Sequence, residues 1–206
     1  MSALLIIDVQ NDFMKGGSLE VSDANEILQP INSLRDKLKF DLVVLSQDYH
    51  PSNHISFASN HTGEKLFSTI TLENGTEQVM WPDHCVQESH GCEFHKDLKI
   101  LSSDEIVRKG MEVNVDSYSA FMGNDKKTKT RMETLLKEKN IKSVYVCGVA
   151  ADYCVFFTAM DSKNAGFDTY FMKDLTKAVN PKELESIYQQ LSDIHVKVIN
   201  SCDISL

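Results

Sequence analysis

The sequence predicts an α/β fold, built on a doubly wound, mostly parallel six-stranded sheet with helices on both faces. Short apolar runs rich in β-branched residues alternate along the chain with amphipathic helical stretches, and this alternation is typical of a parallel sheet covered by helices. A length of 206 residues suits one domain, so residues 1–206 are expected to fold as a single unit. The hydrophobic content of 42% and the charged content of 25% are those of an ordinary soluble globular protein.

Six segments are predicted to be strands because they are short, apolar and largely without polar alternation, as strands buried on both faces are. In chain order they cover residues 3–7, 42–46, 105–109, 143–149, 169–172 and 196–199.

Helical spacing of apolar residues appears between these strands. The three clearest sets are Ile27, Ile31, Leu34 and Leu38; then Met132, Leu135 and Leu136; and last Leu184, Ile187, Tyr188 and Leu191. Pro30 is expected to kink or delay the first of these helices, because proline removes a backbone donor. Asn180 and Pro181 are expected to cap and open the last one.

Charge and cysteine usage restrict the classes of function and the compartment. A net charge of −9 argues against a nucleic-acid partner, which would require a basic face. The five cysteines are odd in number and form no CxxC pair, which favours a reducing compartment. Asp8 interrupts the N-terminal apolar run, so that run is neither a signal peptide nor a membrane span. A cytoplasmic protein without a membrane partner is therefore expected.

The segment from Tyr49 to about Leu98 shows little periodicity, and a loop of that length is usually functional. It holds six of the seven histidines, which are His50, His54, His61, His84, His90 and His95. This clustering indicates a site.

Reactive side chains lie at four successive strand ends: Asp8, Asp48, Lys109 and Cys154. Ligands of open α/β sheets bind beyond the carboxyl ends of the strands. Any one of these side chains could be structural, because strand ends are often polar. Four together favour a shared crevice.

Cys154 is the best candidate nucleophile. It lies at the start of a predicted helix, whose terminus is expected to lower the pKa of the thiol and to offer N–H groups to an oxyanion. Cys147 lies inside a strand and is expected in the core, whereas Cys85, Cys92 and Cys202 fall in irregular regions. Asp8 is the candidate base, since an apolar pocket beside Lys109 would let it take and return a proton.

Asp48 and His50 form a D-x-H pair, whose side chains point the same way in extended backbone and can face one metal ion. Such ligands suit zinc, or iron or manganese where waters complete an octahedron. The residues themselves leave the third ligand open among His54, His61, His84, His90 and His95.

Five motifs resemble those of the nicotinamidase branch of the isochorismatase-like cysteine hydrolases. They span residues 3 to about 160 and read Asp8-Val9-Gln10-Asn11-Asp12-Phe13; Gln47-Asp48-Tyr49-His50-Pro51 with Ser56-Phe57-Ala58; Trp81-Pro82-Asp83-His84-Cys85; Lys109-Gly110 with Tyr118-Ser119-Ala120-Phe121; and Gly148-Val149-Ala150-Ala151-Asp152-Tyr153-Cys154-Val155.

The resemblance implies a strand order of 3-2-1-4-5-6 and a role for each matched residue. It assigns the triad to Asp8, Lys109 and Cys154. It assigns Asp48, His50 and His84 as ligands of one divalent metal ion, for which zinc is the first choice. It places the oxyanion hole at the N–H groups of Ala150 and Cys154, beside a cis peptide bond after Val149. It assigns the contacts to a pyridine ring to Phe13, Trp81 and Tyr118.

The implied function is hydrolysis of nicotinamide to nicotinate and ammonia, through a cysteine thioester, in NAD salvage. Two alternatives are another isochorismatase-like amidase that needs no metal, and a non-catalytic binding protein on the same fold. The three metal ligands argue against the first and the complete triad against the second. His61, His90 and His95 are expected at the surface. The native metal, a homo-oligomeric state, the activity on pyrazinamide-like analogues and the roles of His54 and residues 60–80 stay open.

Overall fold

A computed structural model describes residues 1–73 and 75–204. Its main sheet has the order β5-β2-β1-β6-β7-β8, and every neighbouring pair of strands is parallel. The strands are β1 (Ser2–Ile7), β2 (Leu42–Asp48), β5 (Glu105–Lys109), β6 (Ser143–Val149), β7 (Asp168–Lys177) and β8 (Lys197–Ile199). Numbered by their occurrence in this sheet, these strands follow the predicted order 3-2-1-4-5-6, which is confirmed.

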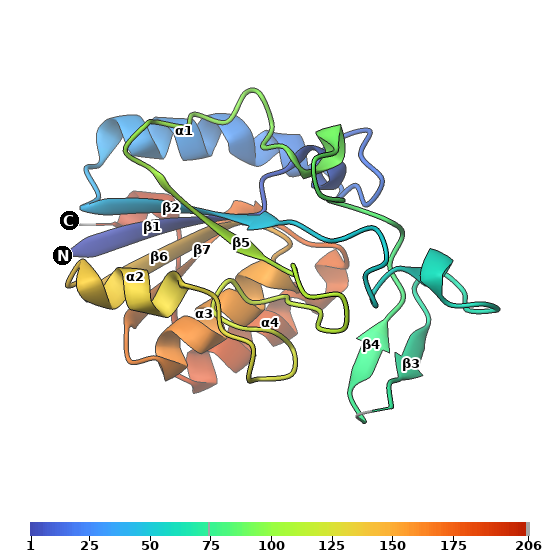
Figure 1. The fold of residues 1–206 in the computed structure, drawn as a ribbon. Coiled ribbons are helices and arrows are strands. Elements are labelled where there is room, and N and C mark those ends of the chain that lie inside the picture. Colours follow the sequence, from blue (N-terminus) through green and yellow to red (C-terminus); the bar gives the residue numbers. More distant parts are fainter. Residues whose placement is uncertain (74, 205–206) are drawn as a thin grey trace.

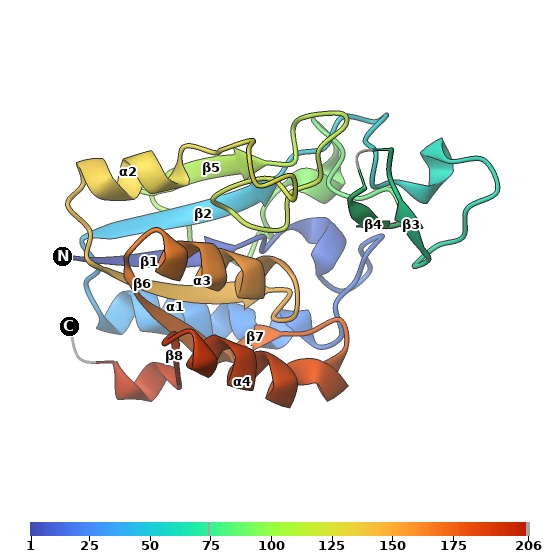
Figure 2. The ribbon, with the colours of Figure 1, turned by 90° about the horizontal axis from the view of Figure 1, so that it is seen from below.

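Helices cover both faces of this sheet, as Figures 1 and 2 show from two directions. The first, α1 (Leu28–Lys37), lies on one face. The other face carries α2 (Met132–Glu138), α3 (Cys154–Asn164) and α4 (Leu184–Asp193). The doubly wound architecture is therefore confirmed.

The central strand β1 divides the apolar core into two parts. Ala3, Leu5 and Ile7 contact the cluster beneath α2, α3 and α4. Leu4 and Ile6 belong to the cluster beneath α1. All five side chains are fully buried, and each leucine or isoleucine buried in this way contributes about 1.5–3 kcal/mol. Burial on both faces is the reason that this strand reads as a continuous apolar run.

Strand β7 is longer than the sequence predicts, since it continues five residues beyond Met172 to Lys177. The exposed residues Lys173 and Asp174 interrupt its apolar pattern, close to an irregularity in its pairing with β6. Beyond them, Leu175 and Thr176 are buried again. Because these two polar residues interrupt the apolar run, the sequence did not predict the second half of the strand.

The two predicted helix starts behave as expected. A 3-10 turn over Ala24–Ile27 precedes α1, so Pro30 falls in the first turn of the α-helix, where its missing N–H requires no partner. The proline therefore delays this helix. Before α4, the Asn180 side chain accepts a hydrogen bond from the Lys182 N–H, as an N-cap does.

A second, two-stranded sheet forms a hairpin between β3 (Thr69–Thr71) and β4 (Glu77–Val79). It projects from the body at the end where the carboxyl ends of the main strands lie, opposite the termini (Figure 1). This hairpin lies within residues 60–80, whose role the sequence left open, because three-residue strands with mostly exposed side chains carry little periodicity. Within the described part of the chain, no helix combines the length and apolarity needed to cross a bilayer.

Candidate active site

The four polar or reactive residues predicted at strand ends lie together in the structure. Asp8 follows β1, Asp48 and Lys109 end β2 and β5, and Cys154 opens α3 just after β6. Asp48 and Lys109 are direct partners in the register of their two strands. All four residues are at least nine-tenths buried, so they form one charged cluster inside an otherwise apolar sheet edge.

The ammonium group of Lys109 is the centre of this cluster. Its Nζ lies 2.9 Å from Asp8 Oδ2 and 2.6 Å from Asp48 Oδ1, and it donates to the Ser117 carbonyl at 2.8 Å. Cys154 Sγ is 3.5 Å away from the same nitrogen. Burial by itself would lower the pKa of Lys109, but Asp48 and Asp8 outweigh it and hold the pKa well above its usual value. The lysine is therefore a fixed positive charge beside the thiol.

Asp8 is arranged to receive a proton. Its Oδ1 accepts a hydrogen bond from Ser46 Oγ at 2.6 Å, and that hydroxyl also accepts from the Asp8 N–H. Its Oδ2 is ion-paired with Lys109 but accepts no aligned hydrogen bond from the described residues. Burial raises the pKa of Asp8, against the opposing effect of Lys109. A carboxylate oxygen of Asp8 and the Cys154 sulfur lie within 4.8 Å of each other, so a small side-chain shift or one intervening water would connect them for proton transfer.

The Cys154 thiol differs in one respect from the expectation. Burial raises its pKa well above the ordinary value, and the nearby charge of Lys109 opposes this shift without cancelling it. The expectation of a lowered thiol pKa was therefore wrong, because it considered the helix terminus and not the burial of the sulfur. A thiol with a raised pKa requires a base for its reaction.

Two backbone N–H groups beside the sulfur are available to a ligand. The peptide bond between Val149 and Ala150 is cis, as the resemblance implied. The neighbouring groups are occupied, since the Ala151 N–H donates to Lys177 and the Val155 N–H to Ala150. Within residues 1–73 and 75–204, the N–H groups of Ala150 and Cys154 donate to no protein acceptor. They can hold a developing negative charge on a carbonyl oxygen.

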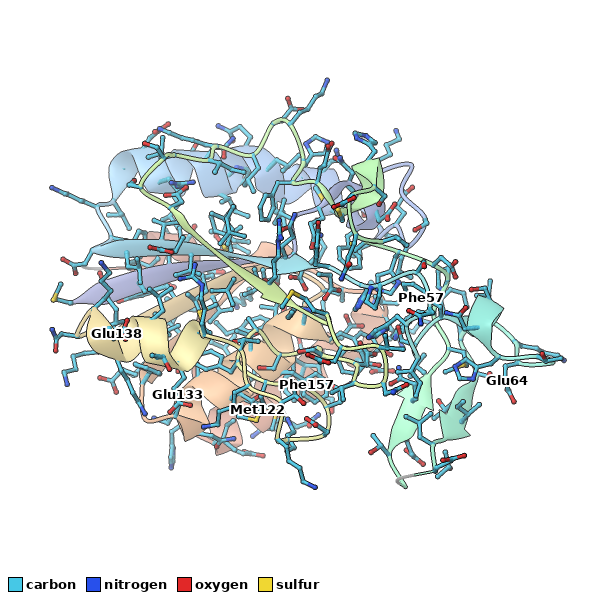
Figure 3. All side chains as sticks on the ribbon, viewed as in Figure 1. Phe57, Glu64, Met122, Glu133, Glu138 and Phe157 are labelled. Carbon is cyan, nitrogen blue, oxygen red and sulfur yellow. The ribbon has the colours of Figure 1, made fainter. Side chains whose placement is uncertain are left out.

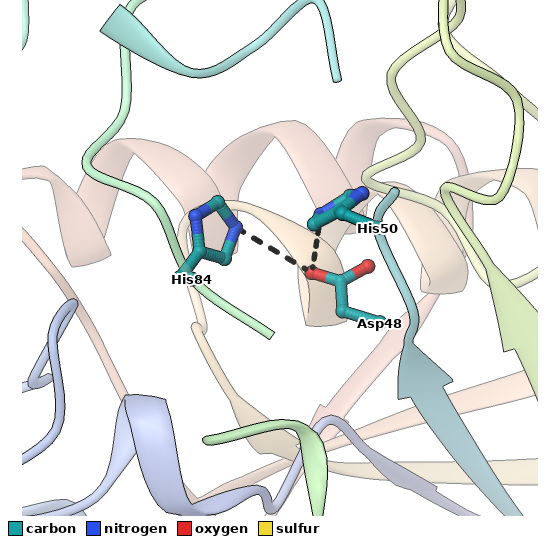
Figure 4. Close-up of side chains that lie close together, drawn as sticks. All are labelled: Asp48, His50 and His84. Atoms are coloured by element: carbon teal, nitrogen blue, oxygen red, sulfur yellow. Dashed lines mark ion pairs between the residues drawn. The ribbon is translucent and has the colours of Figure 1, made fainter. Parts of the chain in front are cut away.

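Asp48, His50 and His84 converge on one point, as Figure 4 shows. Asp48 Oδ2 lies 3.5 Å from His50 Nε2 and 3.9 Å from His84 Nε2. The other ring nitrogens face carbonyl groups, His50 Nδ1 that of Gly110 at 2.8 Å and His84 Nδ1 that of Pro82 at 2.7 Å. A histidine bound to a metal typically donates from its second nitrogen in this way.

These three residues fit a divalent metal ion. Their ligand atoms all lie within 4.8 Å of one another, and all three side chains are buried. Burial, and next the charge of His50, lower the pKa of His84 to about 4, so its Nε2 lone pair is available at neutral pH. Two imidazoles and one carboxylate are typical ligands of zinc and of related transition metals.

His54, whose role the sequence left open, lies beside this cluster. Its ring packs against that of His50 in a tilted arrangement, with 4.1 Å between centroids. Its Nδ1 lies 2.8 Å from Ser56 Oγ, and its Nε2 lies 3.3 Å from the Val115 carbonyl. Both ring nitrogens thus have protein partners, so His54 supports His50 in this arrangement.

The three histidines expected at the surface differ in their exposure. The side chain of His90 is exposed, whereas that of His95 is 14% exposed. His61 is half-buried, and its ring nitrogen lies 2.7 Å from the Ile55 carbonyl. The expectation holds for His90 and in part for His61 and His95, whose side chains are only partly exposed.

A small, mostly apolar pocket is lined by the Cys154 thiol on one side and by the candidate metal ligands Asp48 and His84 on the other. The residues that line it are Phe13, Leu19, Val21, Asp48, Trp81, His84, Asp116, Tyr118, Ala150, Tyr153, Cys154 and Val179. The three predicted ring contacts Phe13, Trp81 and Tyr118 are among them. The sequence did not indicate that Asp116 and Tyr153 line this pocket, although Tyr153 directly precedes Cys154 in its motif.

Aromatic side chains fix the walls of this pocket. Trp81 donates from Nε1 to the Tyr118 hydroxyl at 3.2 Å, and its ring meets that of Tyr153 edge-on at 5.0 Å. On the metal side, the buried ring of Phe57, labelled in Figure 3, packs against both His50 and His84 with centroids 5.5 Å apart. The pocket is therefore preformed.

Gly110 connects the two parts of the site. It follows Lys109 directly, adopts a positive φ of 64°, and its carbonyl faces His50 Nδ1. A Cβ atom at this position would lie 2.3 Å from Cε1 of the His50 ring. Only glycine allows the backbone to approach the histidine so closely.

Comparisons with known proteins agree with this geometry. An isochorismatase domain model matches residues 2–203. A nicotinamidase of Acinetobacter baylyi is 44% identical over 203 residues, which cover 98% of this chain and 94% of the relative. The yeast nicotinamidase bound to the inhibitor nicotinaldehyde has a TM-score of 0.92 at 31% identity, covering 97% and 100% of the two chains. A pyrazinamidase of Pyrococcus horikoshii in complex with zinc has a TM-score of 0.78 at 32% identity, covering 97% and 98%.

Proposed function

Because this chain belongs to the isochorismatase family, we propose that it is a nicotinamidase, which hydrolyses nicotinamide to nicotinate and ammonia. One observation carries the proposal: a single pocket is lined by the Cys154 thiol and by the metal-cluster residues Asp48 and His84. A flat heteroaromatic amide can place its carboxamide at the sulfur and its ring nitrogen toward the cluster. Relatives named nicotinamidase in Acinetobacter baylyi and yeast support the same substrate.

In the proposed reaction, Asp8 takes the proton of the Cys154 thiol, and the charge of Lys109, 3.5 Å from the sulfur, stabilises the thiolate. The sulfur attacks the carboxamide carbon, and the carbonyl oxygen becomes an oxyanion that the N–H groups of Ala150 and Cys154 hold. Asp8 returns the proton to the departing nitrogen, which leaves as ammonia and a thioester remains. Asp8 then takes a proton from water, whose oxygen attacks the thioester, and the thiol is restored as nicotinate leaves.

Asp48, His50 and His84 would hold the divalent ion, and we propose zinc, with iron or manganese as alternatives. The imidazole-rich donor set supports this choice, as does the zinc complex of the Pyrococcus horikoshii pyrazinamidase. When bound, the ion supplies a Lewis acid for the pyridine nitrogen, directly or through water. Phe13, Trp81 and Tyr118 would orient the ring, and the apolar lining of the pocket would exclude bulk water.

The test compares ammonia release from nicotinamide and from benzamide, with the metal content of the protein measured in parallel. Benzamide keeps the shape and the carboxamide but lacks the ring nitrogen. A site that binds a specific heteroatom rejects the analogue without it, so we expect at least ~10²-fold lower kcat/KM for benzamide. Equal kcat/KM values for the two amides would mean that the ion has a structural role. The nicotinamide assignment would then lose its main chemical support.

The same measurements address the two alternatives. A metal-free amidase of the same fold would release ammonia from another amide and would keep its rate after chelation. A binding protein without catalysis would release none. The buried ion pairs of Lys109 with Asp8 and Asp48 at the thiol argue for catalysis.

We further propose that residues 1–206 act as one hydrolase domain in the cytoplasm, within NAD salvage. The five cysteines are all unpaired, which agrees with a reducing compartment. A homo-oligomeric state is a separate proposal, and light scattering on the purified protein decides it.

A further inference from the structure

The side chain of Gln10 takes the place of a missing strand beside Asp48. Strand β1 ends at Ile7, whereas β2 continues to Asp48. Gln10 Nε2 donates to the Asp48 carbonyl at 2.8 Å, and the Asp48 N–H donates to Gln10 Oε1 at 2.8 Å. The side-chain amide therefore pairs with the Asp48 backbone as a neighbouring peptide group would.

Gln10 also contacts the loop that carries His84. The second hydrogen of Nε2 is donated to the Cys92 carbonyl at 2.8 Å. Both donors of the amide and one acceptor are thus in use, in a side chain that is fully buried. Its three hydrogen bonds tie the end of β2 to the segment that follows the metal-binding histidine.

The carboxylate that Gln10 holds in place serves both parts of the site. Asp48 Oδ1 lies 2.6 Å from Lys109 Nζ, and Oδ2 faces His50 and His84. A rotation or shift of the Asp48 backbone would exchange or lengthen both contacts at once. The division of the two oxygens therefore depends on the backbone position of this one residue.

We propose that Gln10 is a positioning residue, which fixes Asp48 so that one carboxylate oxygen stays on Lys109 and the other stays at the metal. Gln10 is not among the residues that line the pocket, so its effect on the reacting groups passes through Asp48. The part of this proposal that concerns turnover rests on the proposed function, whereas the part that concerns metal binding does not.

The experiment compares Gln10→Met with Gln47→Met. Methionine keeps the length and volume of glutamine and removes the hydrogen bonds. Gln47 is the matched control, because its Nε2 also donates to the Cys92 carbonyl at 2.8 Å while its side chain makes no bond to Asp48. Zinc affinity is measured by competition with a chelator on folded protein, checked by circular dichroism. We expect about 10- to 100-fold weaker zinc binding for Gln10→Met, as for other groups that orient metal ligands, and a change under about threefold for Gln47→Met.

A second readout separates positioning from simple stability. At saturating zinc and nicotinamide, kcat of Gln10→Met should stay at least about 10-fold low, because Lys109 also loses its fixed partner. KM should change less than about threefold, since the aromatic walls of the pocket are untouched. If Gln10→Met does not fold, Gln10→Asn replaces it, because this side chain is polar but one methylene too short for all three bonds.

The outcomes are distinguishable. A lower melting temperature with unchanged zinc affinity and kcat would overturn the proposal and leave Gln10 a structural residue. Equal loss of zinc affinity in the Gln10 and Gln47 variants would overturn it as well. If the wild type released no ammonia from nicotinamide while Gln10→Met still lost zinc, the proposed function would fail and the role of Gln10 would stand.

Discussion

The strand ends and the long loop build the two halves of the site in different ways. Asp8, Asp48, Lys109 and Cys154 stand on or directly beside strands, and the sheet register brings them together. The metal-side histidines and Trp81 lie in the segment between β2 and β5, which is mostly irregular. The proposed reacting groups thus depend on the core of the protein, and the proposed metal ligands His50 and His84 depend on loop contacts.

The loop is nevertheless held by regular backbone pairing. The His50 N–H donates to the Cys85 carbonyl at 3.0 Å, and the Trp81 N–H donates to the Ser56 carbonyl at 2.8 Å. These isolated bridges connect its distant parts, so the order of the loop comes from long-range contacts within itself. Changes at the strand ends should therefore affect chemistry, and changes in the loop should affect metal binding and substrate choice.

The largest expected effect is that of Cys154→Ala. Removal of the nucleophile should lower kcat by at least ~10³-fold while the protein stays folded. Cys147→Ala is the control in the same strand–helix unit, and it should mainly lower the free energy of unfolding by about 0.5–3 kcal/mol, since Cys147 is fully buried. Retention of a tenth of the wild-type rate by Cys154→Ala would contradict a thioester mechanism.

The ion pairs at the strand ends come next. Asp8→Asn should lose at least ~10²-fold in kcat, as expected for a positioned proton-transfer group. Lys109→Ala should lose as much and in addition about 3–5 kcal/mol of unfolding free energy, because it leaves two buried carboxylates without their cation. Initial rates and urea denaturation measure the two effects. The rate losses should not add in the double variant, since the groups act as a unit, and additive losses would mean independent roles.

In the loop half, His84→Ala should reduce zinc affinity by about 10- to 100-fold and diminish the preference for nicotinamide over benzamide. With the thiol, Asp8 and Lys109 intact, the variant should retain measurable amidase activity. The ratio of kcat/KM for the two amides, with zinc content determined on the same sample, checks this. An unchanged ratio in a zinc-depleted variant would place ring recognition elsewhere than at the metal.

The smallest effect is expected at Phe67, in the segment that precedes β3. The Phe67 side chain is exposed and meets the Trp81 ring edge-on at 6.0 Å. Phe67→Ala should change KM less than about threefold and stability by less than about 1 kcal/mol. Trp81→Ala, which removes a pocket wall, should raise KM distinctly more. A larger effect for Phe67 than for Trp81 would mean that the segment before β3 takes part in binding.

The difference between the strand ends and the long loop also determines what could be predicted from the sequence alone. The strands and the position of Asp8, Lys109 and Cys154 at one edge followed from apolar runs and the residues after them, because parallel strands end at one edge. The order of the strands, in contrast, was implied by the family resemblance. Local signals such as Pro30 and Asn180 also predicted the observed helix starts. These features depend on residues that are neighbours in the chain.

Other features depend on long-range contacts. Spacing left five histidines as candidates for the third ligand, and only the resemblance singled out His84. Burial of Cys154, which reverses the expected shift of its thiol pKa, results from the packed environment and not from the helix terminus. The pairing of the Gln10 side chain with Asp48 likewise requires knowledge of where β1 ends and β2 continues.

Gly110 has a consequence for how this site tolerates mutation. Any side chain at this position would place an atom 2.3 Å from the His50 ring, so a substitution here is compatible only with a change at position 50. The two positions are therefore epistatic, although one follows the lysine of the triad and the other belongs to the metal cluster. A mutational scan should find position 110 intolerant in the wild-type background. Replacement of His50 by a smaller residue should relieve only the steric part of this intolerance, because the positive φ of 64° still favours glycine.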